Sequence, residues 1–371
     1  MKKSSQTKNK WLLILSGIVV LSAIGFFFLS RGPAKLTLKK SAHIILIGNN
    51  LGSRMMNFGH FETVLQLRYP DSLLYIRNMC DGGNTPGFRP HSGRPSPWAF
   101  PGAEKFQTEL AFSPGTEGFF ETPDQWISKH KADIIIAFFG FDESFQRKAG
   151  LENYKAELDS FIHHTLGQRY NGVSAPQLAI VSPIAFEDLS KKFDLPNGKA
   201  ENENLALYTA AMKEIAAKNK LLFIDVYDPT KEWFADEGTD FTIDGSQLTN
   251  AGYARLAPLL ADGIFGKSAT IAEANRSLVH AAVMEKNWMW HNDLKIPNGV
   301  HVYGRRYNPF GPDNYPAELK KIREMTFVNA KEVLGIIYSS KTGNTQLKWR
   351  QTRRKNGKRR SRLYKEGALD P

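Results

Sequence analysis

The chain has one cysteine in 371 residues, and this scarcity sets the first limits on what it can be. Cys80 has no second thiol to pair with, so an internal disulfide is impossible. It also lies too far from the apolar N-terminal run to be a lipoprotein attachment site. The sequence has no His-x-x-x-His pair, a spacing that zinc sites use. It therefore gives no support to a disulfide scaffold or to a zinc site.

Acidic residues are absent from residues 1–40, which hold 8 Lys or Arg. Residues 341–371 hold 11 Lys or Arg against only Glu366 and Asp370. The 300 residues between these ends carry 30 basic and 35 acidic side chains. The net charge of +12 therefore comes from the two ends of the chain and not from its middle.

An uncharged run, WLLILSGIVVLSAIGFFFL, occupies residues 11–29 and follows four lysines. At a rise of about 1.5 Å per residue, this length nearly matches a hydrocarbon core of about 30 Å. The positive-inside rule then places the N-terminus in the cytoplasm. We predict a single-pass signal anchor with the main domain outside the cytoplasm. A cleaved signal peptide is the alternative.

Apolar β-rich runs alternate with amphipathic helical patterns through the middle of the chain. Apolar residues at three- and four-residue spacing predict helices at 151–166 and 201–219, among others. Strands buried on both faces and separated by helices predict an α/β fold, a three-layer α/β/α sandwich with a five-stranded parallel sheet. The predicted strands are HIILIG (43–48), LLYIRN (73–78), DIIIAFFG (133–140), QLAIVSP (177–183) and LLFIDV (221–226).

The chain is expected to have four parts. These are a cytoplasmic stub, transmembrane anchor and linker (1–40), the α/β domain (41–266), a helical and aromatic extension (267–340) and a basic tail (341–371). Residues 80–118 are rich in Pro and Gly, and a loop of this length is either a substrate-facing lid or a decorated surface loop. Ligands of such sheets bind where strand order reverses. With the order 2-1-3-4-5, residues 48–53 would lie beside 140–143.

Four segments of this domain resemble, in order, the sequence blocks of the SGNH (GDSL-type) hydrolases. IILIGNNL stands at the Gly-Asp-Ser-Leu block and RNMCDGGNTP at the Asn-x-Gly-x-Ser-Gly-Asp-like turn. FFGFDESF stands at the Gly-x-Asn-Asp block and TIDGSQLTNAGYARLA at the Asp-x-x-His block. The match spans roughly residues 41–265. The resemblance implies a flavodoxin-like sandwich, a serine nucleophile, a His activated by an Asp, and an oxyanion hole.

Carried over residue by residue, the resemblance puts the nucleophile position at Asn50, the oxyanion Gly and Asn positions at Gly83 and Asp142, and the Asp-His pair at Asp244 and Gln247. The Asn50 amide nitrogen has a delocalised lone pair and cannot accept an acyl group. Gln247 has no proton that titrates near neutral pH. Ionised Asp142 would oppose a developing oxyanion. Conventional serine esterase chemistry should therefore be absent or very slow.

The side chains near Asn50 allow other roles. Asn49 and Asn50 either shape the strand-to-helix turn, as good N-caps do, or bind a ligand through their amides. Ser53, about one helical turn past Asn50, is the nearest hydroxyl for a rearranged site. His60 lies two turns further on, about 10 Å along the helix axis, and is too far away to activate Ser53 directly.

Glu143 has two interpretations. It is either a hydrogen-bonding anchor of its loop or, with Asp142 and Asp244, an oxygen ligand of a hard cation such as Mg²⁺ or Ca²⁺. The sequence implies no cofactor beyond this alternative.

The extension contains EKNWMWHNDLKIPNGVHVYGRRYNPFG, which is similar to a segment that follows the SGNH-like domain in certain large bacterial envelope proteins. The similarity rests on Lys286, Asn287, Pro297, Asn298, Tyr303 and Arg305. The segment either binds carbohydrate or anionic groups, or packs the extension onto the core. The rings and arginines concerned are Trp288, Trp290, Tyr303, Tyr307, Arg305 and Arg306.

The basic run at residues 348–367 suits an anionic polymer or anionic lipid. Together these features predict a membrane-anchored, SGNH-hydrolase-like protein of the bacterial envelope that lacks conventional serine esterase activity and binds carbohydrate or acylated glycan. One alternative is an active ester hydrolase of the carbohydrate esterase or deacetylase type with a rearranged site. Another is a surface protein that tethers polyanions.

Overall fold

The computed structural model describes residues 35–91, 93–107, 120–235, 238–269, 273–295, 308 and 311–341. The chain divides into two units, Met1–Lys35 and Leu36–Pro371, and everything below concerns the second. The predicted anchor at 11–29 and nearly all of the basic tail lie outside the described residues. No helix within the described residues is long and apolar enough to span a membrane.

Five parallel strands form one sheet in the order β2-β1-β3-β4-β5, which confirms the predicted sheet and its order. The strands are β1 (His43–Gly48), β2 (Tyr75–Asn78), β3 (Ile134–Phe138), β4 (Gln177–Val181) and β5 (Leu222–Ile224). Every residue of β3 is buried, because both faces of a central parallel strand are covered. The apolar runs in the sequence are these strands.

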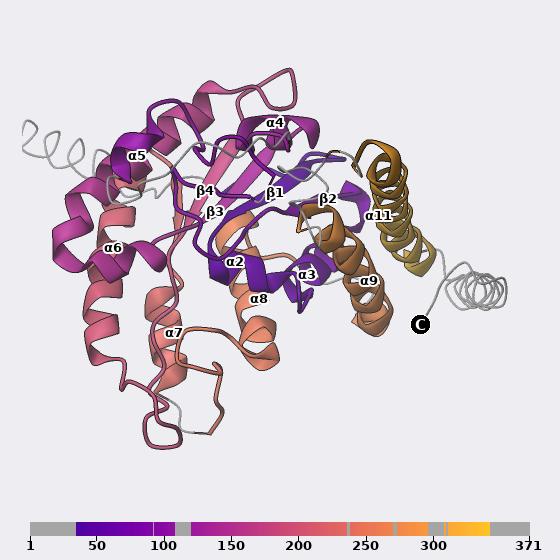
Figure 1. Cartoon of the computed structure of the whole chain (residues 1–371). Coiled ribbons are helices and arrows are strands. Elements are labelled where there is room, and N and C mark those ends of the chain that lie inside the picture. Colours follow the sequence, from indigo (N-terminus) through magenta and orange to yellow (C-terminus); the bar gives the residue numbers. More distant parts are fainter. Residues whose placement is uncertain are drawn as a thin grey trace, which may run out of the picture. The chain divides into compact units, whose positions relative to one another are not determined.

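Helices cover both faces of the sheet, so the described part of the second unit has the three layers expected of an α/β sandwich (Figure 1). On one face, Ile45, Ile135 and Ile180 meet helices α4 (Pro123–Lys129), α5 (Leu151–Gly167) and α6 (Lys199–Lys218). On the other face, Ile44 and Ile136 pack against four helices from the beginning and the end of the sandwich. Those helices are α2 (Asn50–Met55), α3 (His60–Arg68), α7 (Tyr227–Phe234) and α8 (Asn250–Phe265).

Helices α9 (Arg276–Leu294) and α11 (Gly311–Lys341) follow the sandwich and pack along each other (Figure 1). Buried polar contacts join α9 to the sandwich. The Lys286 ammonium lies 2.5 Å from the Glu62 carboxylate on α3, and the Trp290 indole N–H donates to the Asn78 carbonyl over 2.6 Å. Trp290 is 1% exposed, so this ring packs the extension onto the core and is not available for stacking on a ligand.

Short 3-10 helices occupy four turns of the described chain: η1 (Pro70–Ser72), η2 (Ala103–Phe106), η3 (Asp142–Gly150) and η4 (Glu273–Asn275). The described part of the Pro- and Gly-rich segment, 80–91 and 93–107, is packed into the sandwich. Phe100 and Phe106 belong to the main core cluster, and Ala99 donates its N–H to the Gly87 carbonyl. Phe100 and Phe106 therefore anchor this segment on the core, while Gly82 and Gly83 are exposed near its start. Its substrate-facing role stays a prediction.

Candidate functional site

The turn between β1 and α2 is fixed by a glycine that no other residue could replace. Gly48 has φ of 126°, and a Cβ on it would lie 2.0 Å from the Phe138 carbonyl oxygen. The next N–H, on Asn49, donates to that same oxygen over 2.9 Å. The first block and the end of β3 are therefore pressed together at the carboxyl edge of the sheet.

Asn49 occupies the N-cap position of α2 but does not cap it with its side chain. The side chain is 1% exposed, and its Nδ2 has no hydrogen-bond partner within the described residues. The expectation that an Asn oxygen would cap this helix was wrong for Asn49, which makes no side-chain cap hydrogen bond although its backbone is extended, as is usual at an N-cap. Asn50 is the first residue of α2, half-buried, and makes no side-chain hydrogen bond to a described residue.

Gly83 and Asp142, the two predicted oxyanion positions, lie in hydrogen-bonding contact. The Gly83 N–H donates to Asp142 Oδ2 over 3.2 Å. Burial raises the pKa of the Asp142 carboxyl, and the hydrogen bond from Gly83 offsets part of that rise. An N–H that would face an oxyanion in a hydrolase thus already donates to a carboxylate of the chain itself.

Asp244 and Gln247 also meet, in the arrangement of an Asp-His pair. Gln247 donates from Nε2 to Asp244 Oδ2 over 2.7 Å, and its backbone N–H donates to Oδ1 over 2.7 Å. The buried Glu187 carboxylate fixes this loop from below by accepting from the backbone N–H groups of Phe241 and Thr242. The loop therefore holds Gln247 on Asp244, at the positions where the resemblance implies a His and an Asp.

Two contacts hold this loop against α2. The Tyr253 hydroxyl donates to the Leu51 carbonyl over 2.9 Å, and Arg54 Nη2 reaches the Leu248 carbonyl at 3.5 Å. The structure therefore brings Gly83 to Asp142, brings Asp244 to Gln247, and packs the second loop on the helix that Asn50 begins. No hydrogen bond joins the Asn50 side chain to either pair within the described residues.

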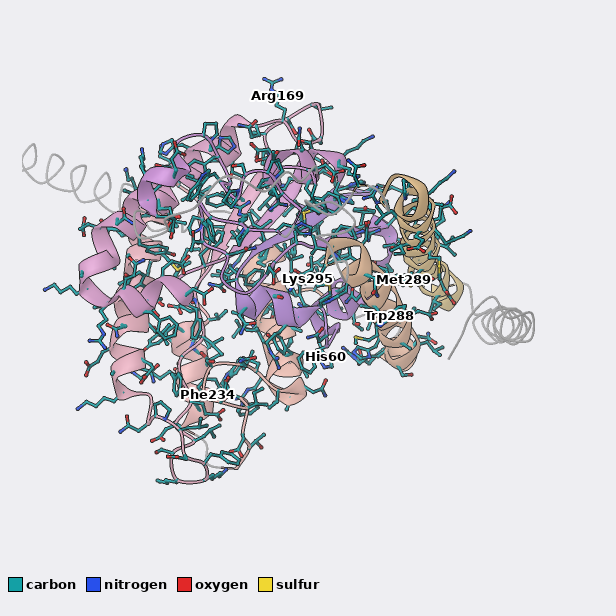
Figure 2. The ribbon with its side chains drawn as sticks, in the orientation of Figure 1. His60, Arg169, Phe234, Trp288, Met289 and Lys295 are labelled. Atoms are coloured by element: carbon teal, nitrogen blue, oxygen red, sulfur yellow. The ribbon has the colours of Figure 1, made fainter. Side chains whose placement is uncertain are left out.

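Ser53 has a partner that the sequence did not predict. Lys295 Nζ lies 3.2 Å from Ser53 Oγ and 2.5 Å from Asp81 Oδ1. Figure 2 places Lys295 where α9 ends. His60 faces elsewhere: it hydrogen-bonds Asn250 over 2.8 Å and stacks on His280, so it does not act on Ser53. Lys295 is 242 residues away in sequence, and no local pattern signals the contact.

Glu143 anchors its loop. It is 6% exposed, and its Oε2 accepts from the Gly140 N–H over 2.8 Å while Oε1 has no partner within the described residues. Burial and the nearby Glu157 raise the pKa of Glu143 well above its ordinary value, which favours its neutral form. The described residues contain no group of three or more His, Cys, Asp or Glu placed to hold a metal ion. Among the predicted roles, Glu143 fits the loop anchor.

A small cavity that no sequence pattern predicts lies beside the turn that contains Gly83. Its volume is about 40 Å³, and it is partly open to solvent. Two arginines buried beside the core line it, Arg89 and Arg94, and Asn84 follows Gly83 directly. Apolar side chains of Ile47, Trp126 and Leu294 complete its walls.

No family model matches the chain, and no curated protein matches it. Similar solved structures include a gut microbial diltiazem-metabolizing enzyme (14% identity, 62% of this chain, TM-score 0.43), of whose length the chain spans 48%. They also include a catalytic mutant of an acetylxylan esterase from Geobacillus stearothermophilus (14% identity, 64% of this chain and 99% of that one, TM-score 0.43). A GDSL-like lipase from Parabacteroides merdae is similar over 62% of this chain and 99% of that one (12% identity, TM-score 0.45).

An acetylxylan esterase and a GDSL-like lipase are thus among the similar solved structures. The sheet order and the contacts among the four blocks give the site its geometry.

Proposed function

We propose that this chain is an envelope-facing protein with an SGNH-type fold that binds carbohydrate or acylated glycan and lacks conventional serine esterase activity. The observation on which the proposal depends is the Gly83 to Asp142 hydrogen bond of 3.2 Å. A carboxylate on this N–H competes with a substrate oxyanion for the same donor and adds a negative charge beside it.

The other two chemical roles support the same conclusion. Asn50, at the nucleophile position, offers an amide that cannot carry the acyl group. Gln247 donates to Asp244 as the family's His would, but it has no basic nitrogen to take a proton from a nucleophile. In a serine hydrolase the loss of triad members costs on the order of 10⁶ in turnover. The Gly83–Asp142 and Asp244–Gln247 contacts keep the loops ordered without supplying a nucleophile or a base, and this favours binding over catalysis.

Hydrolysis of p-nitrophenyl acetate tests the loss of activity. The unmodified protein should be indistinguishable from buffer, and the triple variant Asn50→Ser, Asp142→Asn, Gln247→His should hydrolyse the ester measurably faster. The double variant that keeps Asp142 serves as the matched control, because it restores nucleophile and base but leaves the carboxylate on Gly83. Activity in the unmodified protein that disappears on Ser53→Ala would contradict the proposal.

A second candidate, an ester hydrolase with a rearranged site, is favoured by one contact. Lys295 Nζ stands within hydrogen-bonding distance of Ser53 Oγ, and a neutral lysine can serve as the base for a serine nucleophile. Asp81 opposes this role, because Lys295 Nζ also donates to its carboxylate over 2.5 Å, so the nitrogen is already held in an ion pair. Turnover that vanishes in Lys295→Met and survives in the exposed control Ser174→Ala would establish this candidate.

The proposed place of the protein depends on its ends. The uncharged run at 11–29 would anchor the chain with its main domain outside the cytoplasm, and the basic tail would contact anionic polymers or lipids of the envelope. Binding to an acidic polymer should weaken as salt rises and should be lost when residues 341–371 are removed. Unchanged binding after that deletion would remove the tail from the proposal.

A further inference from the structure

The Gly83–Asp142 pair presents one hydrogen-bond acceptor to solvent. Gly83 is exposed and Asp142 is half-buried, and Asp142 Oδ2 accepts from the Gly83 N–H over 3.2 Å. The other carboxylate oxygen, Oδ1, makes no hydrogen bond to a described residue, and it is not one of the shielded side-chain atoms that lack a partner. It is therefore accessible to solvent. The pair thus offers an acceptor to a ligand, while its backbone donor is already occupied.

An exposed aromatic ring, Phe145, follows Asp142 on the same face of η3. This 3-10 helix begins at Asp142, and side chains three residues apart eclipse each other in such a helix. The one non-helical residue of η3, Arg147, comes after Phe145. Phe145 is 68% exposed, and its ring meets the Phe141 ring edge-on with 5.5 Å between centroids. Because Phe141 packs on the buried cluster around Ala185, the Phe145 ring is supported from behind, and ordering it on binding costs little.

We propose that Asp142 and Phe145 form a subsite for a neutral sugar with a free hydroxyl group, so that the site selects a deacylated glycan over its O-acetylated form. A sugar hydroxyl donates to Asp142 Oδ1, and an apolar face of the sugar ring stacks on Phe145. This inference rests on the glycan binding proposed above and narrows the class of ligand.

An O-acetyl group fits this subsite poorly. Both of its oxygens are acceptors, and the accessible atom of Asp142 is an acceptor as well. The Gly83 N–H, which a hydrolase would offer to the ester carbonyl, already donates to Asp142. An acidic sugar fits no better, because its charge would lie beside that of Asp142. A free hydroxyl supplies the donor that the Asp142 carboxylate needs.

Binding of matched oligosaccharides to the full chain at pH 8 tests the assignment. The probes are xylotriose, cellotriose and mannotriose, each beside its O-acetylated form, with trigalacturonate as the acidic sugar. At least one neutral trisaccharide should bind about tenfold or more tightly than its acetylated form, since the acetylated form leaves Asp142 without a donor. Trigalacturonate should bind more weakly than that neutral sugar.

Asp142→Asn should reverse the preference. The Asn oxygen would accept from Gly83 and turn the NH₂ group toward the ligand, where it can donate to an ester carbonyl. Phe145→Ala should weaken the neutral sugar about tenfold, whereas Phe145→Trp, which keeps an aromatic face, should retain it. The matched control is Phe327→Ala, because Phe327 is 53% exposed and lines a cavity with His43, at the other end of β1. The melting temperature of each variant shows that it is folded.

Equal or tighter binding of the acetylated sugars, or tighter binding of trigalacturonate, by the unmodified protein would overturn the subsite and leave glycan binding in place. An unchanged affinity in Phe145→Ala, or a preference that Asp142→Asn does not reverse, would overturn it as well. Absence of binding to every probe would contradict the proposed function together with the subsite. Failure of the subsite alone is therefore distinguishable from failure of the proposed function.

Discussion

Two positions of the site, Asp142 and Gln247, differ from the residues that the resemblance to the SGNH hydrolases implies, and the consequence of each difference is electrostatic. Asp142 has an oxygen where an Asn would have an NH₂ group. Its carboxylate accepts a hydrogen bond from the Gly83 N–H. Gln247 keeps a donor toward Asp244 but loses the second ring nitrogen through which a His would act. At the residue scale, Asp142 and Asp244 accept hydrogen bonds from Gly83 and Gln247, so these two pairs are satisfied within the chain.

Asp142→Asn should stabilise the protein at neutral pH. Burial raises the pKa of Asp142 above that of the unfolded chain, so the folded state binds this proton more tightly. Stability from this group is therefore fully present at low pH and is lost as pH rises from the ordinary Asp value through the raised value. The amide carries no charge to desolvate, so we expect the melting temperature to rise by about 1 to 3 °C at pH 8.

The same comparison at pH 3 should show a smaller gain or none, because Asp142 is then largely protonated. Asp194→Asn, which alters an exposed carboxyl, is the control and should leave the melting temperature nearly unchanged at both values. A gain at pH 3 equal to that at pH 8 would show that desolvation of the Asp142 carboxylate is not its cause.

Gln247→His should create an imidazole with a raised pKa. The Asp244 carboxylate accepts from the present side chain over 2.7 Å, and an opposite charge this close favours the protonated ring. NMR titration of the new ring should give a value above the ordinary 6.5, and Asp244→Asn in the same background should bring it down. If Asp244→Asn leaves the pKa of the new imidazole unchanged, Asp244 does not hydrogen-bond a His at position 247.

At the scale of elements, the strands were predictable because burial on both faces leaves a local record. β3 is an uninterrupted apolar run, and the predicted strand order matches the observed one. Helices at 151–166 and 201–219 were predicted within a few residues of α5 and α6, because each repeats apolar residues every three or four positions. The resemblance to the SGNH hydrolases singled out the residues of both pairs, and the roles that it implies for them stay predictions.

The contacts that sequence did not predict all join distant segments. Lys295 reaches Ser53 across 242 residues, and Trp290 reaches Asn78 across 212. Arg89 and Asn84 looked like members of a Pro- and Gly-rich loop, and nothing in their neighbours signals a core position. Local periodicity carries information on which face is buried, but not on which remote side chain completes a polar contact.

The junction between α9 and α3 is expected to respond strongly to loss of one charge. Lys286 and Glu62 form an ion pair whose side chains are 3% and 9% exposed. Lys286→Met leaves a buried carboxylate without its partner and should lower the free energy of unfolding by about 3 kcal/mol or more. Chemical denaturation should show this, and the double variant with Glu62→Leu should recover most of the loss. No recovery in the double variant would mean that packing, and not the charge, is responsible.

At the scale of the whole molecule, the charge distribution separates the middle of the chain from its two ends. The chain between residues 41 and 340 is slightly acidic, while the basic residues that produce the excess lie in the outer segments. Removing either end should therefore change where the protein binds without changing how the sandwich is held together.

The contacts of the first residues of the second unit show where the folded part of the chain begins. Leu36 donates its N–H to the Ile264 carbonyl over 2.8 Å, and Thr37 exchanges two hydrogen bonds with the Gln177 side chain over 2.8 and 2.9 Å. Leu36 and Leu38 also pack on the core beside β1. A chain that starts at residue 35 should thus melt as a folded, cooperative protein.

A chain that starts at residue 40 loses these three hydrogen bonds and the two apolar contacts. At about 1 kcal/mol for each hydrogen bond it should melt roughly 3 to 6 °C lower than the chain starting at residue 35. Calorimetry of the two chains in one buffer measures the difference, and Gln177→Ala in the longer chain should reproduce part of it. Equal melting temperatures would mean that residues 35–39 lie on the sandwich without stabilising it.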